Sequence, residues 1–197
     1  MAYNATNSQI HRRSLTACFT YFCPMKKMLV AVLSLPLFYS CAPSNDNLMS
    51  KDQLGSLQST DSIGLVSSLF PEDSIAFERL NTGQIVGLSV LKADQKKRFQ
   101  LRANLEGAIE VVQVYDSLYK TKKGIGVGST IGELEKAYTI DRAVPAIKSV
   151  SVYVKESPLL FLFDRSELPE SIKYSFDPID PVQLPSEAVI NQVIISW

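Results

Sequence analysis

A short apolar segment between two lysines and a cysteine determines how much of this 197-residue chain is available to fold. Lys26 and Lys27 precede an apolar run over residues 28–38, and Ser40 and Cys41 follow it. A basic start, a short apolar run and a small residue before the cleavage point are typical of a secretory signal peptide. The run is too short to span a bilayer, which takes about 20 residues. We therefore expect cleavage after Ser40 and a mature chain that starts at Cys41.

The residues around this point resemble a bacterial lipobox, the site where a lipoprotein precursor is cleaved and its new N-terminal cysteine is lipidated. Ser40 is the small residue before the cysteine, while Phe38 and Tyr39 give the box a relaxed form. The resemblance implies a lipoprotein signal peptide over residues 25–40 and a lipid on Cys41. It also implies attachment to a membrane of the bacterial cell envelope, since two acyl chains anchor a protein stably.

A second cysteine, Cys18, competes for this role because residues 15–18 are closer to the strict lipobox by their letters. The residues before Cys18 are polar and basic, so that site lacks the apolar run that secretion requires. We interpret residues 1–24 as an over-called start or a dispensable leader. An uncleaved anchor is the alternative to lipidation, and the small polar residues 42–47 favour a lipid-attached tether instead.

Removal of residues 1–40 changes the composition that bears on function. These residues carry four basic and no acidic side chains, so the remaining 157 residues hold 16 basic and 20 acidic ones, a net charge of −4. This balance gives no indication of nucleic-acid binding. The removed part also holds His11, Cys18 and Cys23, which leaves the mature chain without imidazole, free thiol or disulfide. We therefore expect no Ser–His or Cys–His catalysis, no metal site and no cofactor.

Residues 41–62 are rich in Ser, Asp, Asn and Gln and predict a flexible tether, which places the folded domain at residues 63–197. At the start of this domain, residues 67–73 have the character of a helix entry. Residues 74–80 then predict a short helix, and Gly83 follows as a stop signal.

The rest of the domain shows mainly strand patterns. Residues 99–105 alternate apolar Phe99 and Leu101 with polar Gln100 and Arg102, as in a half-buried strand. Further runs of strand character cover residues 84–91, 108–115, 148–155, 159–163, 172–176 and 188–196. Short turns between successive runs favour an antiparallel meander.

A glycine-rich segment introduces the second predicted helix, over residues 130–138. Thr130 and Glu133 have the spacing of a capping box, in which each side chain satisfies a backbone N–H at a helix start. The glycines before it permit a tight turn, and they match neither a Walker nor a dinucleotide-binding spacing. We therefore interpret the segment as a structural turn and helix cap, made by Gly124, Gly126, Gly128, Thr130 and Glu133.

The pattern GxGxGSTxxELxxxY, from Gly124 to Tyr138, resembles a motif of uncharacterised bacterial secreted proteins and lipoproteins. The order of elements is similar to small envelope modules of the outer-membrane-assembly lipoprotein and β-lactamase-inhibitor type. This resemblance implies a non-enzymatic binding or scaffold module and supplies no catalytic residue. The expected fold class is α+β, an antiparallel sheet with two short helices on one face, and a duplicated helix–strand–strand module would explain the order.

Charge is distributed unevenly along the domain. Between residues 92 and 123, eight basic side chains stand against four acidic ones. Such an excess would dock an acidic partner or anionic headgroups, although solvated loop tips explain it equally well. The candidate partner-binding patch consists of Lys96, Lys97, Arg98, Lys120, Lys122 and Lys123.

Two further groups support other functions. Five carboxylates lie in a proline-rich stretch: Asp164, Glu167, Glu170, Asp177 and Asp180. They would suit a hydrolase or a calcium site, and solvated loops are the simpler interpretation. Aromatic residues would line a glycan groove unless they belong to the core: Tyr115, Tyr119, Tyr153, Tyr174 and Trp197. The expected function is a lipid-anchored binding or assembly protein with an envelope protein or glycan as partner. A carbohydrate- or small-ligand-binding lipoprotein and a carboxylate-based hydrolase are the alternatives.

Overall fold

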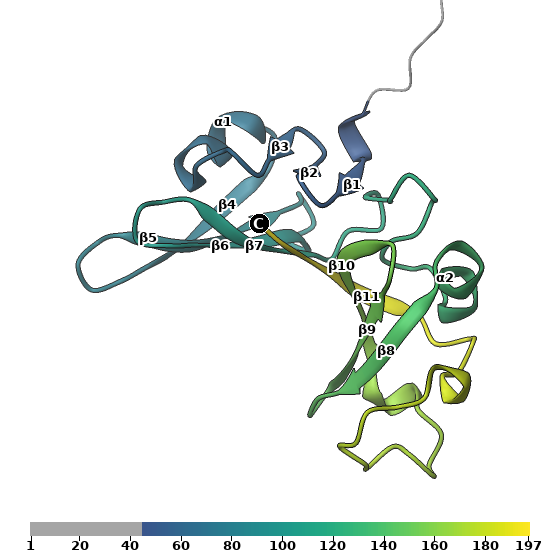
Figure 1. Cartoon of the computed structure of the whole chain (residues 1–197). Coiled ribbons are helices and arrows are strands. Elements are labelled where there is room, and N and C mark those ends of the chain that lie inside the picture. Colours follow the sequence, from purple (N-terminus) through teal and green to yellow (C-terminus); the bar gives the residue numbers. More distant parts are fainter. Residues whose placement is uncertain (1–44) are drawn as a thin grey trace, which may run out of the picture. The chain divides into compact units, whose positions relative to one another are not determined.

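The structure, a computed structural model, describes residues 45–197, and the predicted leader, signal peptide and Cys41 lie outside the described residues. Its centre is an eight-stranded antiparallel sheet in the order β4-β5-β6-β7-β11-β10-β9-β8 (Figure 1). The sheet consists of two four-stranded meanders that pair through β7 and β11. The strands are β4 (Ser74–Arg79), β5 (Ile85–Leu91), β6 (Lys97–Ala103), β7 (Ile109–Val114), β8 (Ile140–Pro145), β9 (Ser149–Val154), β10 (Ser157–Asp164) and β11 (Ile190–Ser196).

The helices of the described residues are few and short. They are η1 (Asn45–Asn47), η2 (Ile63–Leu65), α1 (Val66–Leu69), α2 (Ile131–Ala137), η3 (Arg165–Glu167) and η4 (Pro181–Gln183). A second, small sheet contains β1 (Met49–Ser50), β2 (Gln53–Leu54) and β3 (Leu57–Gln58). The chain is therefore mainly antiparallel β with some helix. None of the helices in residues 45–197 has the length and apolar character needed to cross a bilayer.

Strand register places the core on one face of the large sheet. A single row of paired residues crosses seven strands, and every side chain in it is fully buried: Val90, Phe99, Val114, Val193, Phe161, Val152 and Ala143. Val66 of α1 and Ile131 and Leu134 of α2 belong to the same core cluster. Each such large apolar side chain contributes about 1.5–3 kcal/mol by leaving water. The apolar residues of the alternating strands thus lie on the buried face of the sheet, and the polar residues lie on the opposite face.

The glycine-rich segment forms the turn that leads into α2. Gly124 and Gly128 have φ of +80° and +86°, which side chains with a Cβ rarely adopt. Gly126 is required for space, because a Cβ there would lie 2.3 Å from the Tyr119 carbonyl oxygen. Both capping-box bonds form: Glu133 N donates to Thr130 Oγ1 at 3.2 Å, and Thr130 N donates to the Glu133 carboxylate at 3.0 Å.

We expect Thr130→Ala to lower the free energy of unfolding by about 1 kcal/mol, because the Glu133 N–H loses its side-chain acceptor. Urea denaturation followed by fluorescence of Trp197, the single tryptophan, measures this change. Glu135→Ala, an exposed position on the same helix, is the matched control and should leave the midpoint nearly unchanged. Equal midpoints for both variants would contradict a stabilising cap.

The prediction of a flexible tether is wrong for its described part, residues 45–62. Met49, Leu54 and Leu57 in this segment are at most 1% exposed and belong to the main core cluster. The segment is also hydrogen-bonded to the loop after β7, where Met49 N donates to the Lys120 carbonyl at 2.8 Å. Three buried side chains and a paired backbone make it part of the domain.

Two element predictions are also wrong. Residues 74–80, predicted as a helix, contain strand β4 (Ser74–Arg79) instead, and the first α-helix lies earlier, at Val66–Leu69. β4 pairs with β5 at the sheet edge, where Ile75 and Phe77 lie opposite Val90 and Leu88. Residues 172–176, predicted as a strand, form a turn at 172–174 followed by irregular chain instead.

Candidate binding surface

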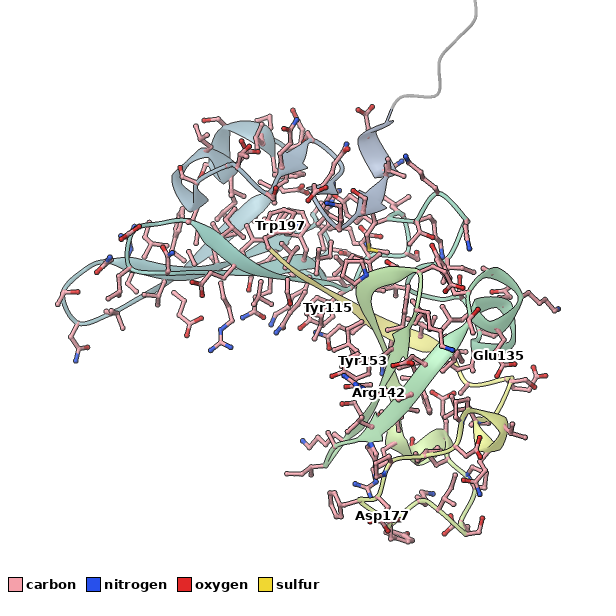
Figure 2. The ribbon with its side chains drawn as sticks, viewed as in Figure 1. Tyr115, Glu135, Arg142, Tyr153, Asp177 and Trp197 are labelled. Atoms are coloured by element: carbon pink, nitrogen blue, oxygen red, sulfur yellow. The ribbon has the colours of Figure 1, made fainter. Side chains whose placement is uncertain are left out.

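No element within residues 45–197 covers the face of the large sheet opposite the core, and we call it the open face. One row of paired residues crosses it from edge to edge: Ala76, Ser89, Gln100, Gln113, Ile194, Leu160, Tyr153 and Arg142. In Figure 1 the helices and β1–β3 lie on the other side of the sheet. Figure 2 likewise places Tyr115, Tyr153 and Arg142 on one side and Glu135 of α2 on the other. The open face is thus a mixed polar and apolar surface supported by a rigid sheet.

Polar side chains connect three strands at the centre of the open face. Tyr115 Oη donates to Gln113 Oε1 at 3.0 Å, and Gln192 Nε2 of β11 donates to Tyr115 Oη at 3.5 Å. On β6, Lys97 Nζ donates to Gln100 Oε1 at 3.1 Å and lies 5.7 Å from the centre of the Tyr115 ring. Partial burial raises the pKa of the Tyr115 hydroxyl, so it remains a neutral donor at physiological pH. This network links side chains of β6 and β11 to Tyr115, the residue that follows β7.

A second cation–aromatic pair lies on the other half of the open face. The Arg142 guanidinium of β8 is 4.3 Å from the centre of the Tyr153 ring of β9. Between this pair and the central network lie Leu160 and Ile194, which are partly exposed. Tyrosine and arginine around apolar side chains are typical of the energetically important part of a protein interface.

The open face carries charges of both signs. Its basic side chains at paired strand positions are Lys97, Arg102 and Arg142. Its acidic ones are Glu78, whose carboxylate lies over Gly87, Glu110, which lines a hollow together with Glu78 and Arg102, and Asp164 at the end of β10. Asp164 is occupied in capping η3, where it accepts a hydrogen bond from Ser166 N at 2.8 Å.

The six residues of the predicted basic patch have different environments, and Lys97 is the one that the structure places on the open face. Lys120 Nζ donates to the Val127 carbonyl at 2.8 Å, and burial lowers its pKa. Lys123 lies 4.3 Å from the centre of the Tyr138 ring, while Lys96 pairs with Asp94 at 3.2 Å. Lys122 is exposed in the turn before Gly124.

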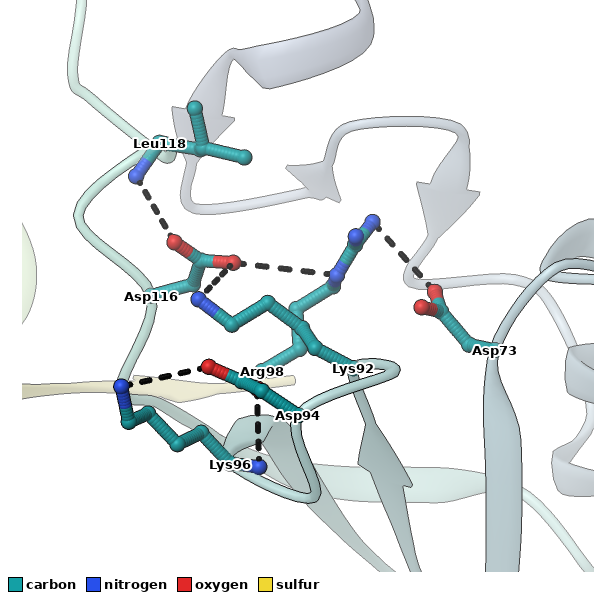
Figure 3. A network of polar contacts seen from close by, with 7 residues as sticks. All are labelled: Asp73, Lys92, Asp94, Lys96, Arg98, Asp116 and Leu118. Atoms are coloured by element: carbon teal, nitrogen blue, oxygen red, sulfur yellow. Dashed lines mark hydrogen bonds and ion pairs between the residues drawn. The ribbon is translucent and has the colours of Figure 1, made fainter.

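Arg98 is directed away from the open face by a β-bulge. The register shifts between Val90 and Leu91, so that Arg98 is the extra residue between Lys97 and Phe99. Its guanidinium lies 3.3 Å from the Asp73 carboxylate and 3.7 Å from the Asp116 carboxylate, which Lys92 also approaches at 3.4 Å (Figure 3). Asp116 is 3% exposed. Arg98 therefore has a structural role in an internal ion cluster.

The carboxylates of the proline-rich stretch act within their own loops. Asp164 and Asp180 cap η3 and η4, and hydrogen bonding to Ser166 lowers the pKa of Asp164. Glu167 accepts from Val189 N at 2.8 Å, Glu170 pairs with Lys173, and Asp177 binds the Ser175 hydroxyl. Within residues 45–197 no three acidic, histidine or cysteine side chains converge as metal ligands would.

The five aromatic residues suggested for a glycan groove do not share one surface. Tyr115 and Tyr153 lie on the open face, whereas Tyr119 is 2% exposed and packs against Phe99 with ring centres 6.1 Å apart. Trp197 packs against the core, and its backbone N–H donates to the Glu110 carbonyl. Tyr174 lines a separate hollow of about 420 Å³ with Ile147 and Phe176.

Arg165 supports that hollow through bonds to the chain itself. Its guanidinium donates to the carbonyls of Ala146, Lys173 and Ser175 at 2.6–2.9 Å and stacks 4.2 Å from the centre of the Phe176 ring. This guanidinium stabilises the loop. Its N–H donors are already used by backbone carbonyls and are not available to a ligand.

Most residues of the open face were not predicted from the sequence. Gln113, Gln192 and Arg142 were not singled out, although each is followed along its strand by a buried residue. The signal that could have found them is the polar half of each alternating strand. It becomes a surface only when strand order is known.

Comparison with known proteins gives a likeness of fold. No family model and no curated protein matches the chain. Among solved structures, it is similar to the crystal structure of the uncharacterised protein YfeY from Escherichia coli. The similarity has a TM-score of 0.55 at 17% sequence identity, over 76% of this chain and 99% of that chain. At this identity the likeness concerns the fold alone.

Proposed function

We propose that this chain is a lipid-anchored protein of the bacterial cell envelope that binds another protein through the open face and catalyses no reaction. The lipobox-like sequence at Cys41 supports the anchor. The open face of the sheet is the observation that carries the binding role, because a large polar and aromatic surface remains uncovered in the described domain.

The chemistry of this surface suits a protein partner better than a small molecule. Its side chains spread over eight strands instead of surrounding a deep cavity, and small-molecule sites are typically concave and enclosed. Tyr115, Tyr153 and Arg142 are of the types that contribute most to protein interfaces. Because Lys97, Arg102 and Arg142 stand beside Glu78, Glu110 and Asp164, the surface would select a partner with a complementary pattern of both charges.

We further propose that the domain is an α+β module made by duplication. The chain runs through α1 and the meander β4–β7, then through α2 and the meander β8–β11. The two meanders meet as equivalent edges at β7 and β11. A duplicated helix and four strands would generate this order and the continuous open face at once.

The test is crosslinking and pull-down of the anchored protein from envelopes, with variants on both faces of the sheet. We expect Arg142→Ala and Tyr153→Ala each to reduce capture of the partner about tenfold or more, because they remove one cation–aromatic pair at the interface. Glu135→Ala on the covered side is the control and should bind normally. Capture that is equally strong in all three variants would reject the open face as the binding surface.

The same experiment separates the alternatives. A glycan-binding protein would release its partner in excess soluble glycan and depend on Tyr115 and Tyr153 more than on Arg102. A carboxylate-based hydrolase would lose turnover when Asp177 or Asp180 is replaced, with binding through the open face unaffected.

A further inference from the structure

The chain enters the domain on the covered side of the sheet. Asn47 and Met49 hold this entry in place: the Asn47 carbonyl accepts from Lys120 N at 3.0 Å, and Met49 N donates to the Lys120 carbonyl at 2.8 Å. Met49, Leu54 and Leu57 insert into the same core as the inward side chains of the sheet. The start of the domain is therefore fixed next to the turn that contains Lys122 and opposite the open face.

Little chain separates this entry from the lipid-bearing residue of the proposed function. Four residues lead from Cys41 to Asn45. Since one residue spans at most about 3.6 Å, four residues of extended chain reach at most about 14 Å from Asn45. A lipid on Cys41 would therefore keep the headgroup layer close to η1.

Basic side chains lie beside the entry point, whose own helix η1 carries the exposed Asp46. A hollow of about 250 Å³ beside β1 is lined by Ser50, Lys51, Lys122 and Lys123, among others. Asp52 pairs with Lys51 at 2.9 Å, and Glu156 accepts three hydrogen bonds from Thr139 at 2.6–3.2 Å, which lower its pKa. Lys123 donates to the Ala137 carbonyl, so Lys122 is the basic residue of this group without a described partner among residues 45–197. Lys122 is exposed and is free to meet phosphate groups of lipids.

We propose that the domain rests on anionic lipid headgroups through an anchor-side surface formed by Lys51, Lys122 and Lys123, with the open face directed away from the bilayer. This inference rests on the lipid anchor of the proposed function. It adds an orientation, because the anchor-side surface and the open face belong to opposite sides of one sheet (Figure 1). The open face then points into the compartment, where a protein partner can reach it.

The test uses the mature lipidated protein in vesicles of phosphatidylethanolamine and phosphatidylglycerol that contain a headgroup spin-labelled lipid. Because Cys41 carries the lipid, one introduced cysteine is the only free thiol, and a dye attached to it reports contact with headgroups. Ser50→Cys places the dye on the anchor-side surface, and Arg102→Cys places it on the open face. We expect quenching to be several-fold stronger at position 50 than at position 102.

Flotation of the vesicles separates the two proposals. Protein that does not float with them overturns the anchor. Protein that floats but shows equal quenching at both positions, or stronger quenching at position 102, overturns the orientation while the anchor stands. Adding Lys122→Gln to the Ser50→Cys protein should shift the docked-to-undocked ratio roughly fivefold, the effect of one basic residue near an anionic surface. An unchanged ratio would remove Lys122 from the contact.

Discussion

Leu54→Ala should lower the free energy of unfolding of the mature domain by about 3 kcal/mol, within the range for truncation of a buried leucine. Leu54 is fully buried in β2 and packs in the main core, although it belongs to a segment whose composition is that of a linker. Truncation removes apolar contact and leaves a cavity in a close-packed interior. Urea denaturation of the Cys41→Ala mature chain, followed by Trp197 fluorescence, gives the value.

Lys51→Ala is the matched control, because it lies in the turn between β1 and β2 and its side chain is 67% exposed. Its ion pair with Asp52 is a surface pair worth at most about 1 kcal/mol, so the midpoint should hardly change. If Leu54→Ala were as mild as Lys51→Ala, residues 45–62 would be a tether after all. A large effect would place the N-terminal segment inside the cooperative unit, as the anchor-side orientation requires.

Local patterns of apolar residues predicted six of the eight strands of the large sheet, because the positions that face the core carry apolar side chains. Residues 148–155, for example, alternate Val150, Val152 and Val154 with polar side chains, and all three valines are buried in β9. Short turns between these runs correctly indicated antiparallel pairing. The glycine-rich turn and α2 also lie where the pattern placed them, since a capping box is a local signal.

The two missed strands are the sheet edges, β4 and β8. β4 has mostly exposed side chains, and its Ala, Glu and Arg favour helices, so local composition opposed the pairing that β5 imposes. β8 combines charged Asp141 and Arg142 with a terminal Pro145, which an edge tolerates because one side of its backbone needs no partner. An edge strand is stabilised by the strand it pairs with. A local window of the sequence does not show that pairing.

The N-terminal segment and the open face were missed for a related reason. Leu54 and Leu57 are isolated apolar residues in a polar stretch, and they join a core cluster that includes Tyr119, whose ring approaches Gly55 between them from more than 60 positions away in the sequence. The open face joins β6, β7 and β11, so Gln100, Gln113 and Gln192 become neighbours only through strand order. The candidate site therefore depends on the pairing of strands that are distant in the sequence.

Asp116→Ala should destabilise the domain by about 2–3 kcal/mol, because it leaves Arg98 and Lys92 without their shared carboxylate. Removal of one partner from a fully buried pair costs about 3–5 kcal/mol, and the partial exposure of Arg98 (26%) and Lys92 (33%) reduces that value. Asp116 Oδ1 also accepts a hydrogen bond from Leu118 N at 3.1 Å, which holds the loop after β7 (Figure 3). The Asp73 carboxylate remains as the single anion beside Arg98.

Lys96→Ala provides the control in the same region, because it removes an ion pair with Asp94 whose basic side chain is 77% exposed. Its effect should stay below about 1 kcal/mol and disappear in 1 M salt, where the screening length is about 3 Å. The effect of Asp116→Ala should persist in that salt, since Asp116 is shielded from solvent. If both effects vanish together, the cluster acts as a surface network and does not fix the loop between β7 and α2. If only the Lys96 effect vanishes, the buried carboxylate is what aligns Lys92, Arg98 and the loop that carries the anchor-side turn.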